Sequence, residues 1–161
     1  MPPTASEPEL RAADLHALLG EATATVRAMT PARWSATVPG DGRTTAAVAS
    51  HIVLHLSLAT FAVGVAKGEA GPQASFTKEM LDGYNAAEAA RNASIPPATV
   101  LEALATQGPV AVAALRGIPA EAFDRSVAMT ITGGAQVSVR VIVEGILLGD
   151  IRGHLDSLRG L

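Results

Sequence analysis

The feature of this chain that most restricts its fold is a series of long segments in which apolar residues recur every three or four positions. Such spacing gathers the apolar side chains on one face of an α-helix. It occurs over Glu7–Met29, Thr44–Lys67, Ala98–Leu115 and Val139–Leu158, and more weakly over 76–93. The pattern predicts an all-α protein, an up-down four-helix bundle whose helices bury these stripes against one another.

The composition supports packed helices. Apolar residues make up 48% of the 161 residues, whereas aromatic residues make up only 3%. A core of alanine, leucine and valine with few rings suits helices better than a β-sandwich. The chain is long enough to bury a core of its own, and no linker or internal repeat divides it. We therefore expect a single domain over residues 1–161.

Two segments interrupt the helical pattern. Over Ser126–Val137, apolar side chains alternate with small and polar ones, and the pair Gly133–Gly134 suits a turn. This predicts a short β-hairpin or an extended arm before the last helix. Inside 98–115, Gly108 and Pro109 are expected to kink or split the helix, because proline removes one backbone hydrogen bond.

Charge and composition narrow the classes of partner. The formal net charge is −3 and no basic stripe is present, which argues against nucleic acid. The run Met1–Pro8 does not read as a signal peptide. The apolar stretch Ile52–Ala66 is interrupted by polar residues and is shorter than the ~20 residues that span a bilayer. We expect a cytoplasmic protein that binds neither nucleic acid nor membrane.

Two pairs of candidate metal ligands stand four residues apart in predicted helices. His51 and His55 form one pair, and Asp150 and His154 form the other. Residues four apart share a helix face, with roughly 6 Å between their Cβ atoms, so both can reach one ion. The chain has no cysteine, so a metal here would use histidine, carboxylate or water. Each pair alone also fits a packing histidine or an ion pair, whereas both together predict a divalent-metal site between two facing helices.

Three stretches carry a resemblance to a known family. The first leads from Trp34 through the turn Pro39–Gly42 to His51 and Ile52, the second is 84–91, and the third is Gly149–Leu158. They resemble the DinB-like superfamily and, more narrowly, its actinobacterial branch related to mycothiol-dependent maleylpyruvate isomerase. The resemblance covers nearly the whole chain and implies a DinB-like metal-binding four-helix bundle.

The resemblance also implies a ligand set. His51 matches the ligand on the second helix, His154 matches the second histidine of the last helix, and Asp150 stands where the family has histidine or glutamate. These three residues are the implied metal ligands, for zinc first and otherwise nickel or iron. His55 matches no family ligand and is expected to pack in the core or hydrogen-bond nearby, with a role as fourth ligand left open. Arg43 stands where many relatives have tryptophan, a difference expected to alter the pocket mouth.

A function follows from the same resemblance. In this family the metal is thought to activate a low-molecular-weight thiol such as mycothiol, since metal binding favours the nucleophilic thiolate. The implied protein is a transferase or isomerase of a small electrophilic substrate, and a chain without cysteine is compatible with a thiol that arrives as a cofactor. Tyr84, Asn85 and Arg152 are candidates for binding that cofactor, although packing, local and surface roles also fit them.

No catalytic residue is indicated by the sequence, and two other functions stay open. One is a non-catalytic binding or stress-response protein of the same fold. The other is a non-haem iron enzyme with a site of two histidines and one carboxylate. An exposed apolar helix face would favour a homodimer.

Overall fold

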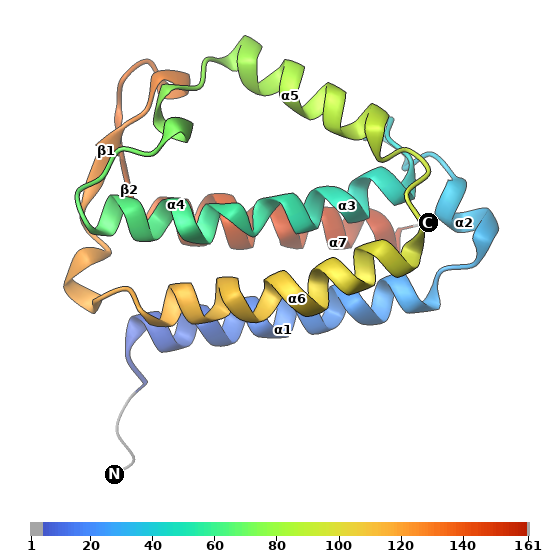
Figure 1. Cartoon of the computed structure of the whole chain (residues 1–161), viewed down its shortest axis with the longest axis horizontal. Helices are drawn as coiled ribbons and strands as arrows, with labels where there is room; N and C mark the ends of the chain where they lie inside the picture. The colour runs from blue at the N-terminus through green and yellow to red at the C-terminus, as the bar shows by residue number, and fades with distance from the viewer. Residues whose placement is uncertain (1–4, 161) are drawn as a thin grey trace.

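The part of the chain that this computed structural model describes, residues 5–160, is built around four rods of helix that pack side by side (Figure 1). They are α1 (Glu7–Ala28), α3 with α4 (Thr45–His55 and Ser57–Ala66), α6 (Pro97–Arg116), and the π-helix η4 with α7 (Val141–Leu148 and Gly149–Arg159). Along the chain, α1 and η4–α7 run in one direction and α3–α4 and α6 run in the other. The predicted all-α, up-down four-helix bundle is confirmed.

Local signals place the helix ends close to their predicted bounds, although the single helix predicted over 44–67 is interrupted at Leu56, where α3 ends and α4 begins. Ser6 and Glu9 form a capping box at the start of α1, and the hydroxyl of Thr44 accepts a hydrogen bond from the backbone N–H of Ala47 at the start of α3. The last helix differs from the prediction in type, since Val141–Leu148 within it form a π-helix. A π segment inserts a wider turn and is often found at functional sites.

The apolar stripes predicted over residues 7–29 and 98–115 include Leu10 and Val110, and both side chains are exposed in the structure. Leu10 on α1 is 47% exposed and Val110 on α6 is 67% exposed. Each stands two positions from buried neighbours, Leu10 from Ala12 and Val110 from Gly108, and side chains two apart on a helix point in different directions. The prediction of burial was therefore wrong for these two side chains.

Helix α6 is one element despite the proline inside it. It runs from Pro97 to Arg116 through Pro109, so the helix is not split. The preceding Gly108 is buried against α1, where a Cβ atom added to it would lie 2.9 Å from Cδ1 of Leu19. The missing side chain therefore lets α1 and α6 approach closely.

The remaining elements cover the ends and one side of the bundle. Strands β1 (Ser126–Ala128) and β2 (Gln136–Ser138) form an antiparallel pair with Val127 opposite Val137, which confirms the predicted hairpin. Helix α5 (Lys78–Arg91) lies outside the four rods, above α3 and α4 in Figure 1. The short elements are α2 (Pro31–Ser35), η1 (Pro72–Ser75), η2 (Ala120–Ala122) and η3 (Thr130–Thr132).

Trp34 anchors the connector between α1 and α3. Its ring is buried on α2, and its indole Nε1–H donates a hydrogen bond of 2.8 Å to the carbonyl oxygen of Ile95 in the turn before α6. Thr44 makes a second link, because its hydroxyl donates to the carbonyl of Ala93 at 2.8 Å. These bonds hold α2 and the start of α3 against the turn between α5 and α6.

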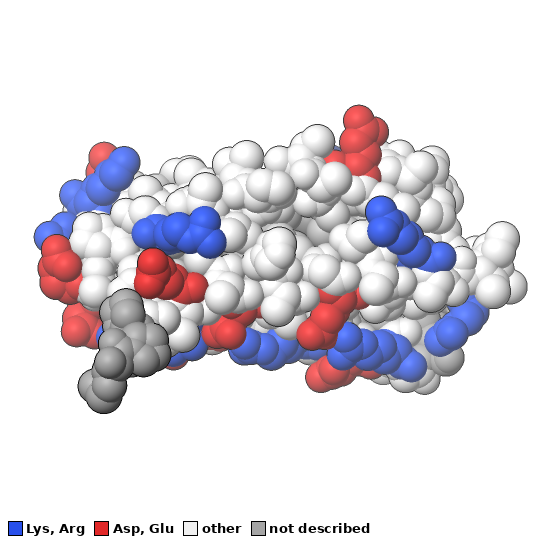
Figure 2. Space-filling view, turned by 90° about the horizontal axis from the view of Figure 1, so that it is seen from below, with Lys and Arg blue, Asp and Glu red and all other residues white. Residues whose placement is uncertain are grey.

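Two helical stretches are long and apolar enough to cross a membrane by length and composition alone. They are Thr45–Ala66 and Pro97–Arg116, of which 56% and 33% of the most apolar window is buried within the fold. Core helices of soluble proteins pass the same test, so this is weak evidence for a membrane segment. Figure 2 shows basic and acidic side chains intermingled along one face of the molecule. The cytoplasmic location stays a prediction.

Candidate metal centre

Three imidazoles meet where α3 faces α7. Donor nitrogens of His51, His55 and His154 all lie within 4.8 Å of one another. The ring centroids are 4.6 Å apart for His51 and His55, 5.2 Å for His51 and His154, and 5.4 Å for His55 and His154. Two segments about a hundred positions apart in the sequence therefore converge on one point.

The positions of these rings follow from the two helices that carry them. His51 and His55 are four residues apart on α3, a helix that is buried over most of its length. His154 is on α7, between the buried Ile151 and Leu155 that seat this helix in the bundle. The rings of His51 and His55 are almost enclosed, with exposed side-chain fractions of 8% and 10%.

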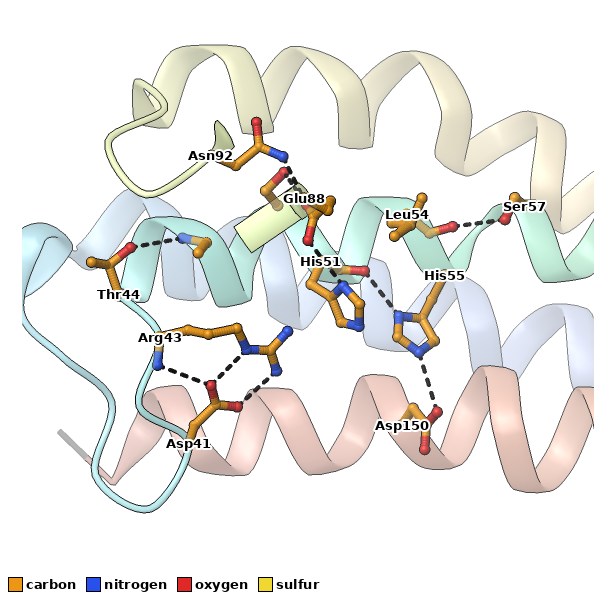
Figure 3. A network of polar contacts seen from close by, with 12 residues as sticks. Asp41, Arg43, Thr44, His51, Leu54, His55, Ser57, Glu88, Asn92 and Asp150 are labelled. Atoms are coloured by element: carbon orange, nitrogen blue, oxygen red, sulfur yellow. Dashed lines mark hydrogen bonds and ion pairs between the residues drawn. The ribbon is translucent and has the colours of Figure 1, made fainter. Parts of the chain in front are cut away.

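Hydrogen bonds define which nitrogen of each α3 histidine carries a proton. Nδ1 of His51 lies 3.2 Å from Oε2 of Glu88, and Nδ1 of His55 lies 2.9 Å from the carbonyl oxygen of His51 (Figure 3). An ionised carboxylate and a carbonyl can only accept, so both Nδ1 atoms donate. In a neutral ring, Nε2 then has the free lone pair that a metal requires.

The carboxylate of Asp150 lies beside the same group. Its Oδ2 is 3.2 Å from Nε2 of His55, and its side chain is 49% exposed. Two atoms that both present lone pairs do not remain at this distance unless a cation, a proton or a metal ion, lies between them. The donor set therefore fits a divalent metal held by imidazole and carboxylate, as zinc, nickel and iron sites often are.

Burial keeps the imidazoles in the neutral form that binds metal. The pKa of His154 is lowered to about 4, mainly because the ring is buried and also because His51 and His55 lie close to it. The negative charge of Asp150 opposes this shift more weakly. Burial also lowers the pKa of His51, and His55 adds to this effect, although the hydrogen bond to Glu88 opposes it. At neutral pH both rings are ready to donate a lone pair.

An arginine–aspartate pair flanks the imidazoles on the loop before α3. The guanidinium of Arg43 binds Asp41 through two hydrogen bonds, Nε to Oδ1 at 2.6 Å and Nη2 to Oδ2 at 2.7 Å, and the backbone N–H of Arg43 donates a third to Oδ1 at 3.2 Å (Figure 3). This pairing lowers the pKa of Asp41, and the guanidinium charge contributes to the lowered pKa of both His51 and His154. A cation beside the site disfavours protonation of the rings, which again favours their metal-binding form.

The structure brings together some of the predicted site residues and separates others. His51 and His154 lie in the histidine group, which also contains His55, whereas Asp150 contacts the group through His55. The ligand set of His51, Asp150 and His154 stays a prediction. Nδ1 of His55 donates to the carbonyl of His51, and its donor nitrogen lies within 4.8 Å of those of His51 and His154. Its role as a packing or hydrogen-bonding residue or as a fourth ligand stays a prediction.

The three residues predicted to bind the cofactor are not gathered in one place. Tyr84 is 46% exposed and lines a cavity of about 500 Å³ between α5, α3–α4 and α6. Asn85 is half-buried on the same helix. Arg152 is exposed and lines a separate hollow between α1 and α7, together with Glu21. Their roles in binding a cofactor stay predictions.

Glu88 is the site residue that the sequence analysis missed. It is 3% exposed, and its carboxylate accepts hydrogen bonds from Ser50 at 3.2 Å, from His51 at 3.2 Å and from Asn92 at 2.8 Å. A glutamate on a helix normally faces water. The signal available in the sequence was a single carboxylate among alanines on both sides, followed by an asparagine four residues later.

The fold and the site together define a class, a helical bundle with a group of three histidines between two of its helices that could hold a metal ion. Comparison with protein families identifies the group within that class: the model of the mycothiol maleylpyruvate isomerase N-terminal domain matches residues 15–145. The chain belongs to this family, which confirms the resemblance seen in the sequence. The match includes both histidines of α3 and ends before Asp150 and His154.

Solved structures give the same fold. The crystal structure of the mycothiol-dependent maleylpyruvate isomerase superposes with a TM-score of 0.72 at 14% sequence identity, covering 94% of this chain and 60% of that one. The structure of a histidine-to-alanine mutant of that isomerase gives the same values. This chain therefore spans 60% of the length of the solved isomerase. Among curated proteins, none matches.

Proposed function

We propose that this protein is a metal-dependent enzyme that uses a low-molecular-weight thiol, mycothiol or a similar compound, on a small electrophilic substrate as an isomerase or transferase. The observation that carries the proposal is the convergence of donor nitrogens from His51, His55 and His154 within 4.8 Å in a chain of the mycothiol maleylpyruvate isomerase N-terminal domain family. Family membership supports the thiol and the isomerase class. The donor group supports the metal.

His51 and His154 would hold the metal from facing helices, with Asp150 as the predicted carboxylate ligand and His55 as a further donor. A bound divalent ion would lower the pKa of a thiol and keep it in the nucleophilic thiolate form. The chain's own part is to present unprotonated Nε2 atoms, which the donated Nδ1–H bonds of His51 and His55 secure. Zinc is the first candidate for a set of nitrogen and oxygen donors, ahead of nickel and iron.

The nucleophile has to come from another molecule, because the chain contains no cysteine. The cavity beside α5 is a candidate place for part of the thiol compound, since a volume of about 500 Å³ lies in the range that holds small ligands. Tyr84 lines this cavity and Glu88 connects it to His51. The separate position of Arg152 gives no support to a role there. Family membership does not favour the non-catalytic or the non-haem iron alternative.

Elemental analysis of untagged protein tests the metal, and cobalt substitution tests the thiol. We expect about one divalent ion per chain, and addition of a thiol to the cobalt protein should produce a thiolate charge-transfer band in the near ultraviolet. His154→Ala should lose the metal. His16→Ala, at an exposed histidine on α1, should retain it. Wild-type protein that holds no ion after incubation with zinc, nickel or iron would contradict the proposal, as would a cobalt spectrum that thiols leave unchanged.

A further inference from the structure

We propose that Glu88 is the positioning residue of this centre, and that α5 is the element that delivers it. In this proposal the carboxylate fixes His51 as the Nδ1–H tautomer, with Nε2 turned toward the other imidazoles. The inference deepens the proposed function and rests on it for the metal. The fixing of the tautomer concerns the metal-free chain as well, so it can be tested without any ion.

The two oxygens of Glu88 have different partners. Oε1 accepts from the hydroxyl of Ser50 at 3.2 Å and from Nδ2 of Asn92 at 2.8 Å, whereas Oε2 lies 3.2 Å from Nδ1 of His51 (Figure 3). The two donors on Oε1 hold the plane of the carboxylate, so that Oε2 remains directed at the imidazole. The carboxylate of Glu88 therefore connects Ser50 and His51 on α3 with Asn92 at the end of α5.

The burial of Glu88 is unusual for its helix. It is the buried residue of α5, in which Leu81 is partly buried and the large apolar side chains of Met80 and Tyr84 are 54% and 46% exposed. A helix that only needed attachment to the bundle would bury an apolar side chain, because a carboxylate loses its hydration on burial. The buried group of α5 is instead a carboxylate in contact with a metal-site imidazole.

This contact has a defined chemical consequence. Histidines that bind metals generally donate their second ring N–H to a carboxylate or a carbonyl, which fixes the tautomer, orients the ring and makes the ligating nitrogen more basic. His51 has such a carboxylate in Glu88, and His55 has a carbonyl in the same role. Glu88 acts only through His51, so it is a positioning residue and no part of the donor group itself.

The test compares Glu88→Gln with Glu79→Gln, which makes the same change at an exposed site on the same helix. Zinc affinity is measured by competition with a chromophoric chelator, and the tautomer of His51 is read from imidazole ¹⁵N shifts in the metal-free protein. We expect Glu88→Gln to weaken zinc binding by about 10–100-fold. We also expect the Nδ1–H form of His51 to dominate in wild type and in Glu79→Gln. It should lose that dominance in Glu88→Gln, because the donors Ser50 and Asn92 hold the amide oxygen and leave the amide NH2, itself a donor, facing Nδ1.

A folded Glu88→Gln variant with unchanged tautomer and unchanged zinc affinity would overturn the proposal and leave Glu88 as an anchor for α5. If wild type binds no zinc, the proposed function fails, while the ¹⁵N shifts still decide the role of Glu88. If Glu88→Gln does not fold, Glu88→Asp replaces it, because the shorter side chain draws the carboxylate away from Nδ1 of His51. That variant must shift the tautomer population in the same direction, and an unchanged population would overturn the proposal.

Discussion

Nε2 of His55 lies 3.2 Å from Oδ2 of Asp150, a residue 95 positions further along the chain. The contact joins the two pairs of candidate ligands, one on α3 and one on α7. Because Nδ1 of His55 already donates to a backbone carbonyl, the nitrogen that faces Asp150 has a lone pair in the neutral ring. A cation shared between imidazole and carboxylate would remove the repulsion between these atoms.

Replacing Asp150 tests whether its carboxylate supports metal binding. We expect Asp150→Ala to weaken zinc binding at least about tenfold, as loss of a ligand or of its hydrogen-bonding partner does. The fold should tolerate the change, since the side chain is about half exposed. Asp156→Ala is the control, because Asp156 is an exposed aspartate on the same helix. Equal zinc affinity of the Asp150 and Asp156 variants would show that the Asp150 carboxylate does not take part in metal binding.

Alanine variants of the three histidines separate ligands from supporting residues. We expect His51→Ala and His154→Ala to lose the metal, because each removes a donor on one of the two facing helices. If His51, Asp150 and His154 are the ligands, as predicted, the His55→Ala variant should retain most of the metal. Metal content after gel filtration and zinc affinity measure both effects. A loss in His55→Ala as complete as in His154→Ala would show that three imidazoles form the ligand set.

Side chains added at Gly20 of α1 and at Gly108 of α6, two helices that pack together, should change the free energy of unfolding in opposite directions. A Cβ on Gly20 meets nothing within 4 Å, so Gly20→Ala should raise the free energy of unfolding by up to about 1 kcal/mol through helix propensity. A Cβ on Gly108 would lie 2.9 Å from Leu19, so Gly108→Val should lower that free energy by about 1–3 kcal/mol through overpacking. Urea unfolding curves measure both. A neutral Gly108→Val would mean that α1 and α6 can move apart at no cost.

The sequence predicted most of the fold because helical periodicity is a local property. It also predicted that His51 and His154 would meet, since ligand pairs at helical spacing specify which faces must converge. The buried face of α5 could not be predicted in this way. Several of its apolar residues, among them Met80 and Tyr84, are exposed, whereas Glu88 is buried against His51 of another helix. The π-helix before α7 was missed as well, because a periodic pattern does not separate a π turn from an α turn over eight residues.

The stability of the metal-free protein should fall as the pH is lowered from about 6.5 to about 4. The pKa of His154 is about 4 in the folded chain against 6.5 for an unperturbed histidine, so within this window the unfolded state binds more protons. The stabilisation is complete above pH 6.5 and is lost as the pH falls toward 4, and the lowered pKa of His51 acts in the same direction. Thermal unfolding midpoints across this range, in the presence of a chelator, measure the effect.

His154→Gln removes one of the two titrating groups and should reduce the dependence of stability on pH, whereas His16→Gln, at an exposed histidine, should leave it unchanged. A slope in His154→Gln as steep as in wild type would show that this ring is protonated in the fold, and therefore unable to donate a lone pair to a metal at mildly acidic pH.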